Sequence, residues 1–331
     1  MSVSLLSVQD LVVSFSTKRG IARAVNGIDF TLEKGEKLGL VGESGSGKSV
    51  TAKSIMRLLQ SPPATIGGKI ELDGEDLLSK TENEMCKYRG NKISMIFQEP
   101  MVSLNPLFSI GNQLAEALRR HTELDRKSIE ERVLTMLHVV GIPSPETRLR
   151  QYPFEMSGGM RQRIMIAMAL LCRPQIIIAD EPTTALDVTI QAQIMELLND
   201  VNREFGTAII LITHDLGVIA EMVDSVAVMY AGSIVEKAKV GDVFESPLHP
   251  YTVGLLRSVP TMEDRGEVLE TIEGQVPSLY DMPEGCAFHN RCHRSKKICR
   301  ARIPPVFDRG GRQVKCWIYS PDWDKETADV E

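Results

Sequence analysis

The sequence predicts an α/β fold built around a phosphate-binding loop. Residues 42–49 read Gly-Glu-Ser-Gly-Ser-Gly-Lys-Ser and match the pattern G-x-x-x-x-G-K-[ST]. An apolar segment at 37–41 precedes the loop and is expected to be a buried strand, and a helix is expected from Lys48 through about Leu59. A second apolar run, at 176–179, has the composition of a parallel strand covered on both faces. Strand, glycine-rich loop and helix in this order predict a nucleotide-binding site.

The residues of the loop suit phosphate chemistry. Its glycines let the backbone curl so that successive N–H groups point at phosphate oxygens, and the following helix adds the positive end of its dipole. Lys48 is expected to reach the β- and γ-phosphates, and the Ser49 hydroxyl is expected to ligate Mg²⁺. The residues expected to contact the nucleotide here are Gly42, Glu43, Ser44, Gly45, Ser46, Gly47, Lys48, Ser49 and Val50.

Composition and charge exclude several classes of protein. The chain has 331 residues, 43% hydrophobic and 25% charged, which suits one large globular domain plus a smaller one, or two medium ones. The net charge of −6 gives no bulk basic character, so we expect no nucleic-acid partner. The N-terminus does not resemble a signal peptide, and no apolar run approaches the roughly 18 residues of a membrane span. We therefore expect a soluble, cytosolic protein.

The remaining elements follow from hydrophobic periodicity. We expect strands at residues 5–15, 24–32, 69–72, 93–97, 176–179 and 207–213, and a hairpin with strands at 226–230 and 233–236. Helical periodicity predicts helical structure over about 111–141 and an amphipathic helix at 189–205 that Gly206 ends. Past about residue 245, Pro, Gly and Cys become more frequent and periodicity fades. This change predicts two domains, at 1–245 and 246–331.

Two acidic residues follow the apolar run at 176–179. Asp180 is expected at the carboxyl end of that strand, where open α/β sheets bind ligands, and there it can hold Mg²⁺ mostly through water. Glu181 comes next and is placed to polarise or deprotonate an attacking water molecule. An Asp-Glu pair alone is usually a solvated surface pair. Behind a buried strand, in a chain with a phosphate loop, the pair predicts nucleotide hydrolysis.

Residues 157–163, Ser-Gly-Gly-Met-Arg-Gln-Arg, resemble the signature of the ATP-hydrolysing subunits of ABC transporters. In that family a serine and two glycines open a helix and contact the γ-phosphate of ATP bound to the opposite subunit. The resemblance implies this role for Ser157, Gly158 and Gly159. Met160 stands where the family usually has Gln, and Met156 stands in place of its leading Leu. Because the serine and both glycines make the phosphate contacts, we expect the composite site to work.

Other family motifs occur in the family's order. The resemblance implies that Gln98 touches Mg²⁺ and the lytic water, that Asp187 of Ala185-Leu186-Asp187 lies at the dimer contact, and that His214 contacts the γ-phosphate. A structural role at a strand end is the alternative for His214. Phe15 resembles the aromatic residue on which adenine stacks; a core phenylalanine is the alternative, and Arg23 is a competitor for the base.

The resemblance narrows to the peptide-importer branch, which includes dipeptide, oligopeptide, glutathione and nickel uptake systems. It is carried by residues 98–106, 179–187, 248–252 and 274–292. It implies a P-loop NTPase of ABC type: a RecA-like mixed-sheet core, an antiparallel β subdomain, a helical subdomain at about 100–165 and a small Cys-rich C-terminal domain.

The cysteines are concentrated near the C-terminus. Cys286, Cys292, Cys299 and Cys316 are separated by five, six and sixteen residues. Their spacing alone leaves open a zinc ion, an iron–sulfur cluster, disulfides or unconnected thiols, because the tight knuckles of zinc sites and the ferredoxin pattern are both absent. Members of the importer branch with such a tail hold a [4Fe–4S] cluster, so the resemblance favours the cluster over zinc.

The function implied by the resemblance is that of an ATPase subunit that powers import of short peptides or a related solute. The expected partners are a second ATPase subunit, favoured to be a paralogue, two transmembrane permease subunits and an extracytoplasmic solute-binding protein. The chain is then peripheral to the cytoplasmic face of the inner (plasma) membrane. The alternatives are a soluble ABC ATPase acting on nucleic acid or ribosomes and a catalytically idle subunit; Lys48, Glu181 and His214 argue against the second.

Overall fold

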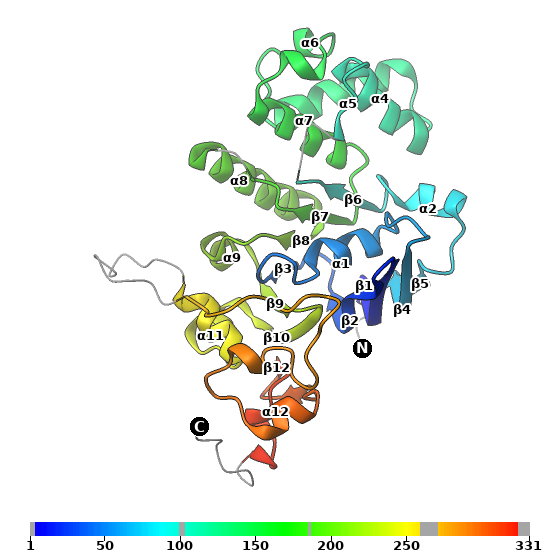
Figure 1. The fold of residues 1–331 in the computed structure, drawn as a ribbon. Helices are drawn as coiled ribbons and strands as arrows, with labels where there is room; N and C mark the ends of the chain where they lie inside the picture. Colours follow the sequence, from blue (N-terminus) through cyan, green and yellow to red (C-terminus); the bar gives the residue numbers. More distant parts are fainter. Residues whose placement is uncertain (1–3, 99–102, 185–186, 259–270, 324–331) are drawn as a thin grey trace. The chain divides into compact units, whose positions relative to one another are not determined.

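The computed structural model describes residues 4–98, 103–184, 187–258 and 271–323 of the chain (Figure 1). The chain divides into two compact units. The first comprises residues 1–5, 32–37 and 77–212, and the second comprises residues 6–31, 38–76 and 213–331. The phosphate loop lies in the second unit, and Asp180 and Glu181 lie in the first.

Three parallel strands form the centre of the first unit. They are β6 (Ile93–Ile96), β7 (Ile176–Asp180) and β8 (Ala208–Ile212), with Ile176 opposite Ile93 on one side and opposite Ala208 on the other. Every residue of these strands is buried. Burial on both faces explains why their sequences are apolar throughout instead of alternating.

Helix α8 (Val188–Phe205) joins β7 to β8. Asp187 caps its first turn, and Gly206 ends it in the left-handed conformation at φ 64°, as the sequence predicts. The Asn202 side chain donates to the carbonyls of Gly35 and Thr207, both at 2.8 Å, and thereby fixes the end of the helix beside the start of β8.

The helical part of the first unit contains most of the segment expected to be helical (Figure 1). Its elements are α2 (Glu82–Tyr88), α4 (Ile110–His121), α5 (Arg126–Val139), α6 (Pro145–Arg148), a 3₁₀ turn at Pro153–Glu155 and α7 (Gly158–Leu170). The expected continuous helical segment at 111–141 is two helices, because Asp125 caps a new helix by accepting from the Ser128 N–H at 2.8 Å. Helices α4, α5 and α7 contact one another.

An antiparallel sheet opens the second unit. Its strands are β1 (Leu6–Thr17), β2 (Gly20–Leu32), β4 (Ala64–Leu72) and β5 (Glu75–Asp76), in the order β2-β1-β4-β5. Strand β1 pairs with β4 from Leu6 opposite Leu72 to Phe15 opposite Ala64, with an irregularity between Gln9 and Val12. This sheet matches the antiparallel β subdomain that the family resemblance implies.

The phosphate loop follows a parallel strand of the same unit. Strand β3 (Lys37–Val41) pairs with β9 (Ser225–Tyr230), which forms the predicted hairpin with β10 (Ser233–Lys239). Helix α1 (Lys48–Ile55) is shorter than expected: Arg57 takes a left-handed conformation at φ 49°, and two prolines follow at 62 and 63. Helices α9 (Leu216–Met222), α10 (Val240–Glu245) and α11 (Pro250–Arg257) complete this region.

Residues 271–323 extend the β9–β10 hairpin (orange to red in Figure 1). Strand β12 (Gln313–Val314) pairs with β10 and with β11 (Phe307–Asp308), and the segment also contains 3₁₀ turns at His289–Arg291 and Trp317–Tyr319 and helix α12 (Lys297–Ala301). Its small core consists of Ile298, Cys299 and Trp317, with Cys286, Phe307 and Trp323 packed against them.

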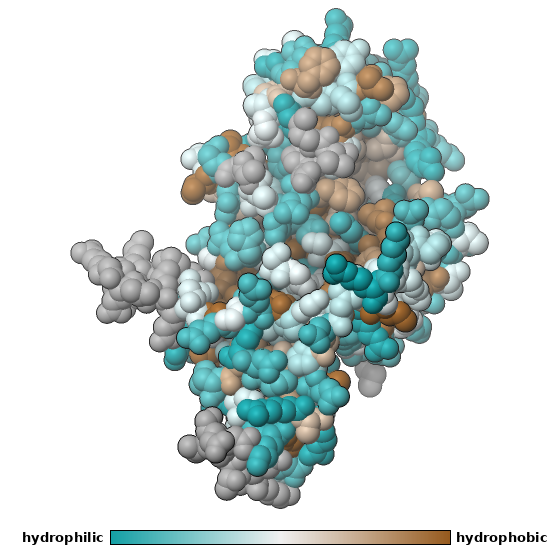
Figure 2. Space-filling model, in the orientation of Figure 1, coloured by the Kyte–Doolittle hydropathy of each residue, from teal (hydrophilic) through white to brown (hydrophobic). Residues whose placement is uncertain are grey.

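Polar side chains cover most of the face that Figure 2 shows. Within the described residues, no helix has the length and apolar character that a membrane crossing requires.

Candidate active site

The phosphate loop has a backbone that only glycine can adopt at two points. Gly42 has φ 146°, and a Cβ atom there would lie 2.1 Å from the Met229 carbonyl oxygen. Gly47 has φ 104°, and a Cβ atom there would lie 2.6 Å from the Ala24 carbonyl oxygen. Strands β9 and β2 therefore press directly against the loop, and the glycines of the motif are needed for packing as well as for curvature.

Lys48 is held at the loop by its own chain. The side chain is buried, and Nζ donates to the carbonyls of Gly42 at 2.7 Å and Glu43 at 3.0 Å and to the Ser46 hydroxyl at 3.3 Å. The ammonium group thus lies among the loop residues expected to surround phosphates. Ser49 follows in the first turn of α1, which has no side-chain cap.

Two residues far along the sequence hold Glu43 of the loop. The Glu43 N–H donates to the Tyr251 hydroxyl at 2.8 Å, and the Glu43 carboxylate forms an ion pair with Arg291 at 2.6 Å. Sequence reasoning noted Tyr251 and Arg291 only as parts of the family resemblance and assigned them no role. Glu43 occupies an unrestricted position of the loop motif, so the sequence carried no signal for these contacts.

In the first unit, the structure brings Gln98 and Glu181 together. Gln98 Nε2 donates to Glu181 Oε2 at 2.8 Å, and the Thr184 hydroxyl donates to the same oxygen at 2.9 Å. Glu181 has φ 47° at the end of β7, and its N–H donates to the Ile212 carbonyl at 2.8 Å. Asp180 is the last residue of β7 and is buried. Both acids therefore lie at the carboxyl end of the parallel strands, as expected.

Ser157 and the two glycines after it open helix α7, as predicted. The Ser157 hydroxyl accepts from the Met160 N–H at 3.3 Å and caps the helix. Ser157 and Gly158 are exposed, and a Cβ atom on Gly158 would meet nothing within 4 Å. Asp187 caps α8 by accepting from the Ile190 N–H at 3.0 Å. Ala185 and Leu186, and residues 99–102 after Gln98, lie outside the described residues.

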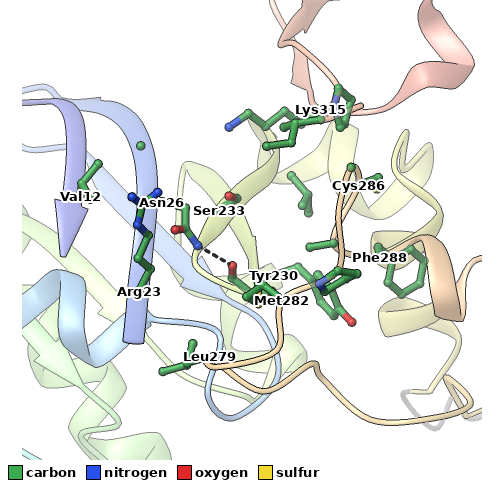
Figure 3. A pocket seen from close by; sticks show the side chains of 18 of the residues that line it. Val12, Arg23, Asn26, Tyr230, Ser233, Leu279, Met282, Cys286, Phe288 and Lys315 are labelled. Carbon is green, nitrogen blue, oxygen red and sulfur yellow. Dashed lines mark hydrogen bonds between the residues drawn. The ribbon is translucent and has the colours of Figure 1, made fainter. Parts of the chain in front are cut away.

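His214 and Phe15 belong to the second unit. His214 is exposed between β8 and the Asp215 cap of α9. Phe15 is half-buried on β1. Arg23, its proposed competitor for the base, lines a cavity of about 680 Å³. Figure 3 shows Arg23 and Asn26 on the β2 side of this cavity, with Cys286 and Phe288 on the side of the C-terminal segment. Phe15 is not among the residues that line this cavity.

The residues expected to hold Mg²⁺ come from both units: Ser49 from the second, Gln98 and Asp180 from the first. Among the residues that the structure describes, no group of three or more His, Cys, Asp and Glu side chains has the arrangement that a metal ion requires.

The four C-terminal cysteines line one small cavity and are free thiols. Burial raises the pKa of the Cys286 thiol to about 11 and that of Cys316 to about 12, and neighbouring thiols contribute. Buried His249 also lines the cavity; its Nδ1 accepts from the Tyr251 N–H at 3.0 Å, and its Nε2 has no hydrogen-bond partner within the described residues. Thiols are the donors that thiophilic metals favour, but within the described residues these four are not arranged as a metal ion requires, and the void is only about 10 Å³.

Comparison with family models gives two matches. The ABC transporter model matches residues 25–184, and the model of the oligopeptide/dipeptide transporter C-terminal region matches residues 235–299. The first match includes the phosphate loop, Gln98, Ser157 and the acidic pair. The second includes Tyr251, Arg291 and three of the four cysteines.

Relatives match over nearly the whole chain. The oligopeptide transport ATP-binding protein AppD of Bacillus subtilis is 49% identical, over 96% of this chain and 98% of its own length. The dipeptide transport ATP-binding protein DppD of B. subtilis is 51% identical, over 95% of this chain and 94% of its own length. The oligopeptide transport ATP-binding protein OppD of Escherichia coli is also 51% identical, over 95% and 93%.

Among solved structures, the ATP-binding cassette MJ0796, a dimer in a post-hydrolysis state bound to ADP and Pi, superimposes with a TM-score of 0.65. It is 26% identical and covers 71% of this chain and 98% of its own length. The α/β fold with a mixed sheet is thus that of an ABC ATPase cassette. Together, the motifs, the fold and identities near one half over the full length show that the chain belongs to the ABC transporter family, among its oligopeptide and dipeptide transport ATP-binding proteins.

Proposed function

We propose that this chain is the ATP-hydrolysing subunit that powers uptake of short peptides through an ABC importer. The observation that carries the proposal is the phosphate loop, which is formed and holds Lys48 in a chain that aligns over 96% of its length with an oligopeptide transport ATP-binding protein. A soluble ABC ATPase acting on nucleic acid or ribosomes is not favoured by these relatives.

The reaction is hydrolysis of ATP to ADP and phosphate. We assign Lys48 to the β- and γ-phosphates, and Ser49, Gln98 and Asp180 to the shell of a Mg²⁺ ion. Glu181 accepts a proton from the attacking water. The water oxygen bonds to the γ-phosphorus, and the bond between the γ-phosphorus and the bridging oxygen breaks, so that ADP leaves with that oxygen. The bonds from Gln98 and Thr184 support this assignment, because they fix the orientation of the Glu181 carboxylate. His214 contacts the γ-phosphate, and Phe15 stacks on adenine.

Two subunits are proposed to close on two ATP molecules. Ser157, Gly158 and Gly159, at the open end of α7, contact the γ-phosphate held by the partner, and Asp187 lies at the contact between subunits. The exposure of Ser157 and Gly158 and the dimer formed by the similar cassette MJ0796 support this arrangement. We propose that the partner is a paralogue of this chain.

The permease is proposed to dock on the helical part of the first unit. Leu107, Phe108 and Phe154 are large apolar residues there with 79%, 53% and 67% of their surface exposed. Phe154 stacks on Tyr152 at 5.6 Å between ring centroids. Exposed apolar side chains of this size favour a protein contact. The complex then comprises two ATPase subunits, two permease subunits and an extracytoplasmic solute-binding protein, with this chain peripheral to the cytoplasmic face of the inner membrane.

Purification of the intact complex in mild detergent tests this function. We expect two membrane permease subunits and a second ATPase to co-purify with this chain, and peptide-loaded binding protein to stimulate phosphate release. A chain that purifies alone from membranes and hydrolyses ATP without response to peptide or binding protein would contradict the proposal. The same purification with Leu107→Ser and Phe154→Ser is expected to lose the permease, whereas exposed Ile303→Ser in the second unit serves as the matched control.

Residues 246–331 are proposed to form a C-terminal domain that holds a [4Fe–4S] cluster on Cys286, Cys292, Cys299 and Cys316. The four thiols line one cavity, with Cys299 and Cys316 buried and Cys286 and Cys292 half-buried, and His249 Nε2 has no hydrogen-bond partner within the described residues; these observations support a bound group. The thiols must move apart to accommodate it, because the void is only about 10 Å³. When bound, such a cluster supplies one-electron redox chemistry.

Iron and sulfide analysis of anaerobically purified protein tests the cluster. We expect a brown protein with about four iron and four sulfide per chain, and Cys292→Ser is expected to be colourless. Cys86→Ser changes a cysteine outside this cavity and is the control that keeps the colour. A colourless protein that contains one zinc ion per chain would overturn the cluster in favour of zinc.

A further inference from the structure

Arg291, in the C-terminal segment at 271–323, makes a two-point ion pair with Glu43. Its side chain is only 5% exposed, and its guanidinium lies against the Glu43 carboxylate with Nη1 2.6 Å from Oε2 and Nη2 3.0 Å from Oε1. Two parallel N–H···O bonds of this kind fix direction as well as distance. A residue of the C-terminal segment is therefore attached rigidly to the second residue of the phosphate loop.

The other donors of the guanidinium are also engaged. Nε donates to the Glu273 carbonyl at 2.8 Å, Nη2 to the Ile272 carbonyl at 3.2 Å, and Nη1 to the Tyr230 hydroxyl at 3.4 Å. The hydrogen bond to Glu43 raises the pKa of Arg291, so the group stays charged at every working pH. Only a planar, forked group can reach all these acceptors at once, and a lysine cannot replace it.

Tyr251 supplies a second anchor on the same loop residue. Its side chain is fully buried and its hydroxyl accepts from the Glu43 N–H at 2.8 Å. The ring packs with Tyr230 at 4.7 Å and Phe288 at 5.4 Å between centroids. Figure 3 shows Tyr230 and, on the C-terminal segment, Phe288. Both the backbone and the side chain of Glu43 are thus held by residues outside the loop.

Glu43 in turn holds the lysine of the motif. Its carbonyl oxygen accepts from Lys48 Nζ at 3.0 Å and from the Ser46 N–H at 3.2 Å. A rotation of the Glu43 peptide would displace both contacts. Arg291 therefore contacts Glu43, and Glu43 contacts the Lys48 ammonium group that is assigned to the phosphates.

We propose that Arg291 is a positioning residue for the phosphate loop, through which the segment that bears Cys292 sets the affinity for nucleotide. The proposal rests on the proposed assignment of the loop to ATP and does not require a cluster. Arg291 touches no phosphate in this scheme; it acts by fixing Glu43. Since the guanidinium is buried, loss of the pair costs more than loss of an ordinary surface ion pair.

The test is the nucleotide affinity of full-length variants, measured by calorimetry with a non-hydrolysable ATP analogue and Mg²⁺. Arg291→Gln is expected to raise Kd about tenfold or more, as for loss of a charge-assisted hydrogen bond. Arg291→Lys, which keeps the charge but not the fork, is expected to raise it several-fold and remains measurable if the glutamine variant fails to fold.

Arg312→Gln is the matched control. It removes an arginine of the same unit that pairs with buried Glu236 at 3.4 Å, and it leaves every loop contact in place. We expect its thermal stability to fall and its Kd to stay unchanged. If Arg291→Gln behaved in the same way, losing stability with an unchanged Kd, Arg291 would only attach the segment and the proposal would be wrong.

A double-mutant cycle with Glu43→Gln tests the route of the effect. If Arg291 acts through Glu43, the double variant binds nucleotide about as weakly as Arg291→Gln alone; losses that multiply would overturn the proposal. Lys48→Ala separates this failure from that of the site itself. Normal binding by Lys48→Ala would reject the ATP assignment, whereas weak binding by Lys48→Ala with normal binding by Arg291→Gln would reject only the positioning role.

Discussion

The two units differ in how closely the rest of the chain packs around their glycine motifs. In the second unit the phosphate loop is enclosed by its own chain: Met229 and Ala24 lie too close to Gly42 and Gly47 for any side chain, and Tyr251 and Arg291 hold Glu43. In the first unit the turn at Ser157 is exposed, and a Cβ atom on Gly158 would meet nothing within 4 Å.

The glycines of the two motifs therefore have different structural reasons. Gly42 and Gly47 of the loop are required by contacts inside this chain. The glycines at the start of α7 are not required by the fold of this chain, which fits a surface used by another molecule. We therefore expect variants of the second unit to change binding, and variants of the first to change hydrolysis.

Glu181→Gln should give the largest difference between the effect on ATP hydrolysis and the effect on ATP binding. Loss of a general base is expected to lower phosphate release by the assembled ATPase about 10²–10⁴-fold, because the amide cannot take the proton of water. The Kd for ATP should stay within about threefold, since the phosphate loop is intact. Comparable loss of binding and hydrolysis, measured by calorimetry and phosphate release, would remove the distinction between the units.

Alanine at two of these glycines should change the unfolding free energy in opposite directions. Gly42→Ala introduces a Cβ atom 2.1 Å from a backbone oxygen at φ 146° and should destabilise the chain by about 3 kcal/mol or more. Gly158→Ala meets open space in a helix and should leave the isolated chain as stable or up to about 1 kcal/mol more stable. Denaturant unfolding of the two variants checks this. Gly158→Ala should still lower turnover of the assembled ATPase.

Lys48→Ala should weaken ATP binding by the isolated chain about 10–100-fold, as for loss of a charged hydrogen bond. The three loop acceptors lose this donor, so a fall in unfolding free energy of about 1–3 kcal/mol is expected. The secondary structure should remain, with an unchanged circular dichroism spectrum. Near-normal affinity would show that the lysine does not face the phosphates. Lys53→Ala, five residues further along α1, is the control that keeps binding.

Ser157→Ala should have a small effect on the isolated chain. It removes the cap of α7, which accepts from the Met160 N–H at 3.3 Å, and is expected to cost about 1 kcal/mol of unfolding free energy. ATP binding by the isolated chain should not change. Ser157→Asp retains a capping group, so it should keep the stability while its charge repels a γ-phosphate; a drop in turnover with normal stability would place the serine at the partner's nucleotide.

Site residues were predictable from the sequence where they belong to a short run of consecutive residues. The phosphate loop, the acidic pair after β7 and the Ser157 cap were all predictable, because a short contiguous motif contains both the chemistry and the turn. The hairpin and the Gly206 end of α8 were predictable for the same reason: the local residue sets the local backbone.

The anchoring of the loop was not predictable, because its partners are distant. Tyr251 and Arg291 follow Glu43 by 208 and 248 residues, and no periodicity connects positions so far apart. The early end of α1 at Ile55 and the break between α4 and α5 were missed for a different reason. In both cases, a single residue, Arg57 or Asp125, interrupts a pattern that is otherwise helical.

The ion pair between Glu43 and Arg291 can form only late in the synthesis of the chain. Glu43 leaves the ribosome 248 residues ahead of Arg291, which at roughly 5–20 residues per second is an interval of about 12–50 s. Throughout that interval the nascent chain carries the whole nucleotide motif without the guanidinium that completes it. A polypeptide that ends before Arg291 therefore contains the motif and lacks the ion pair.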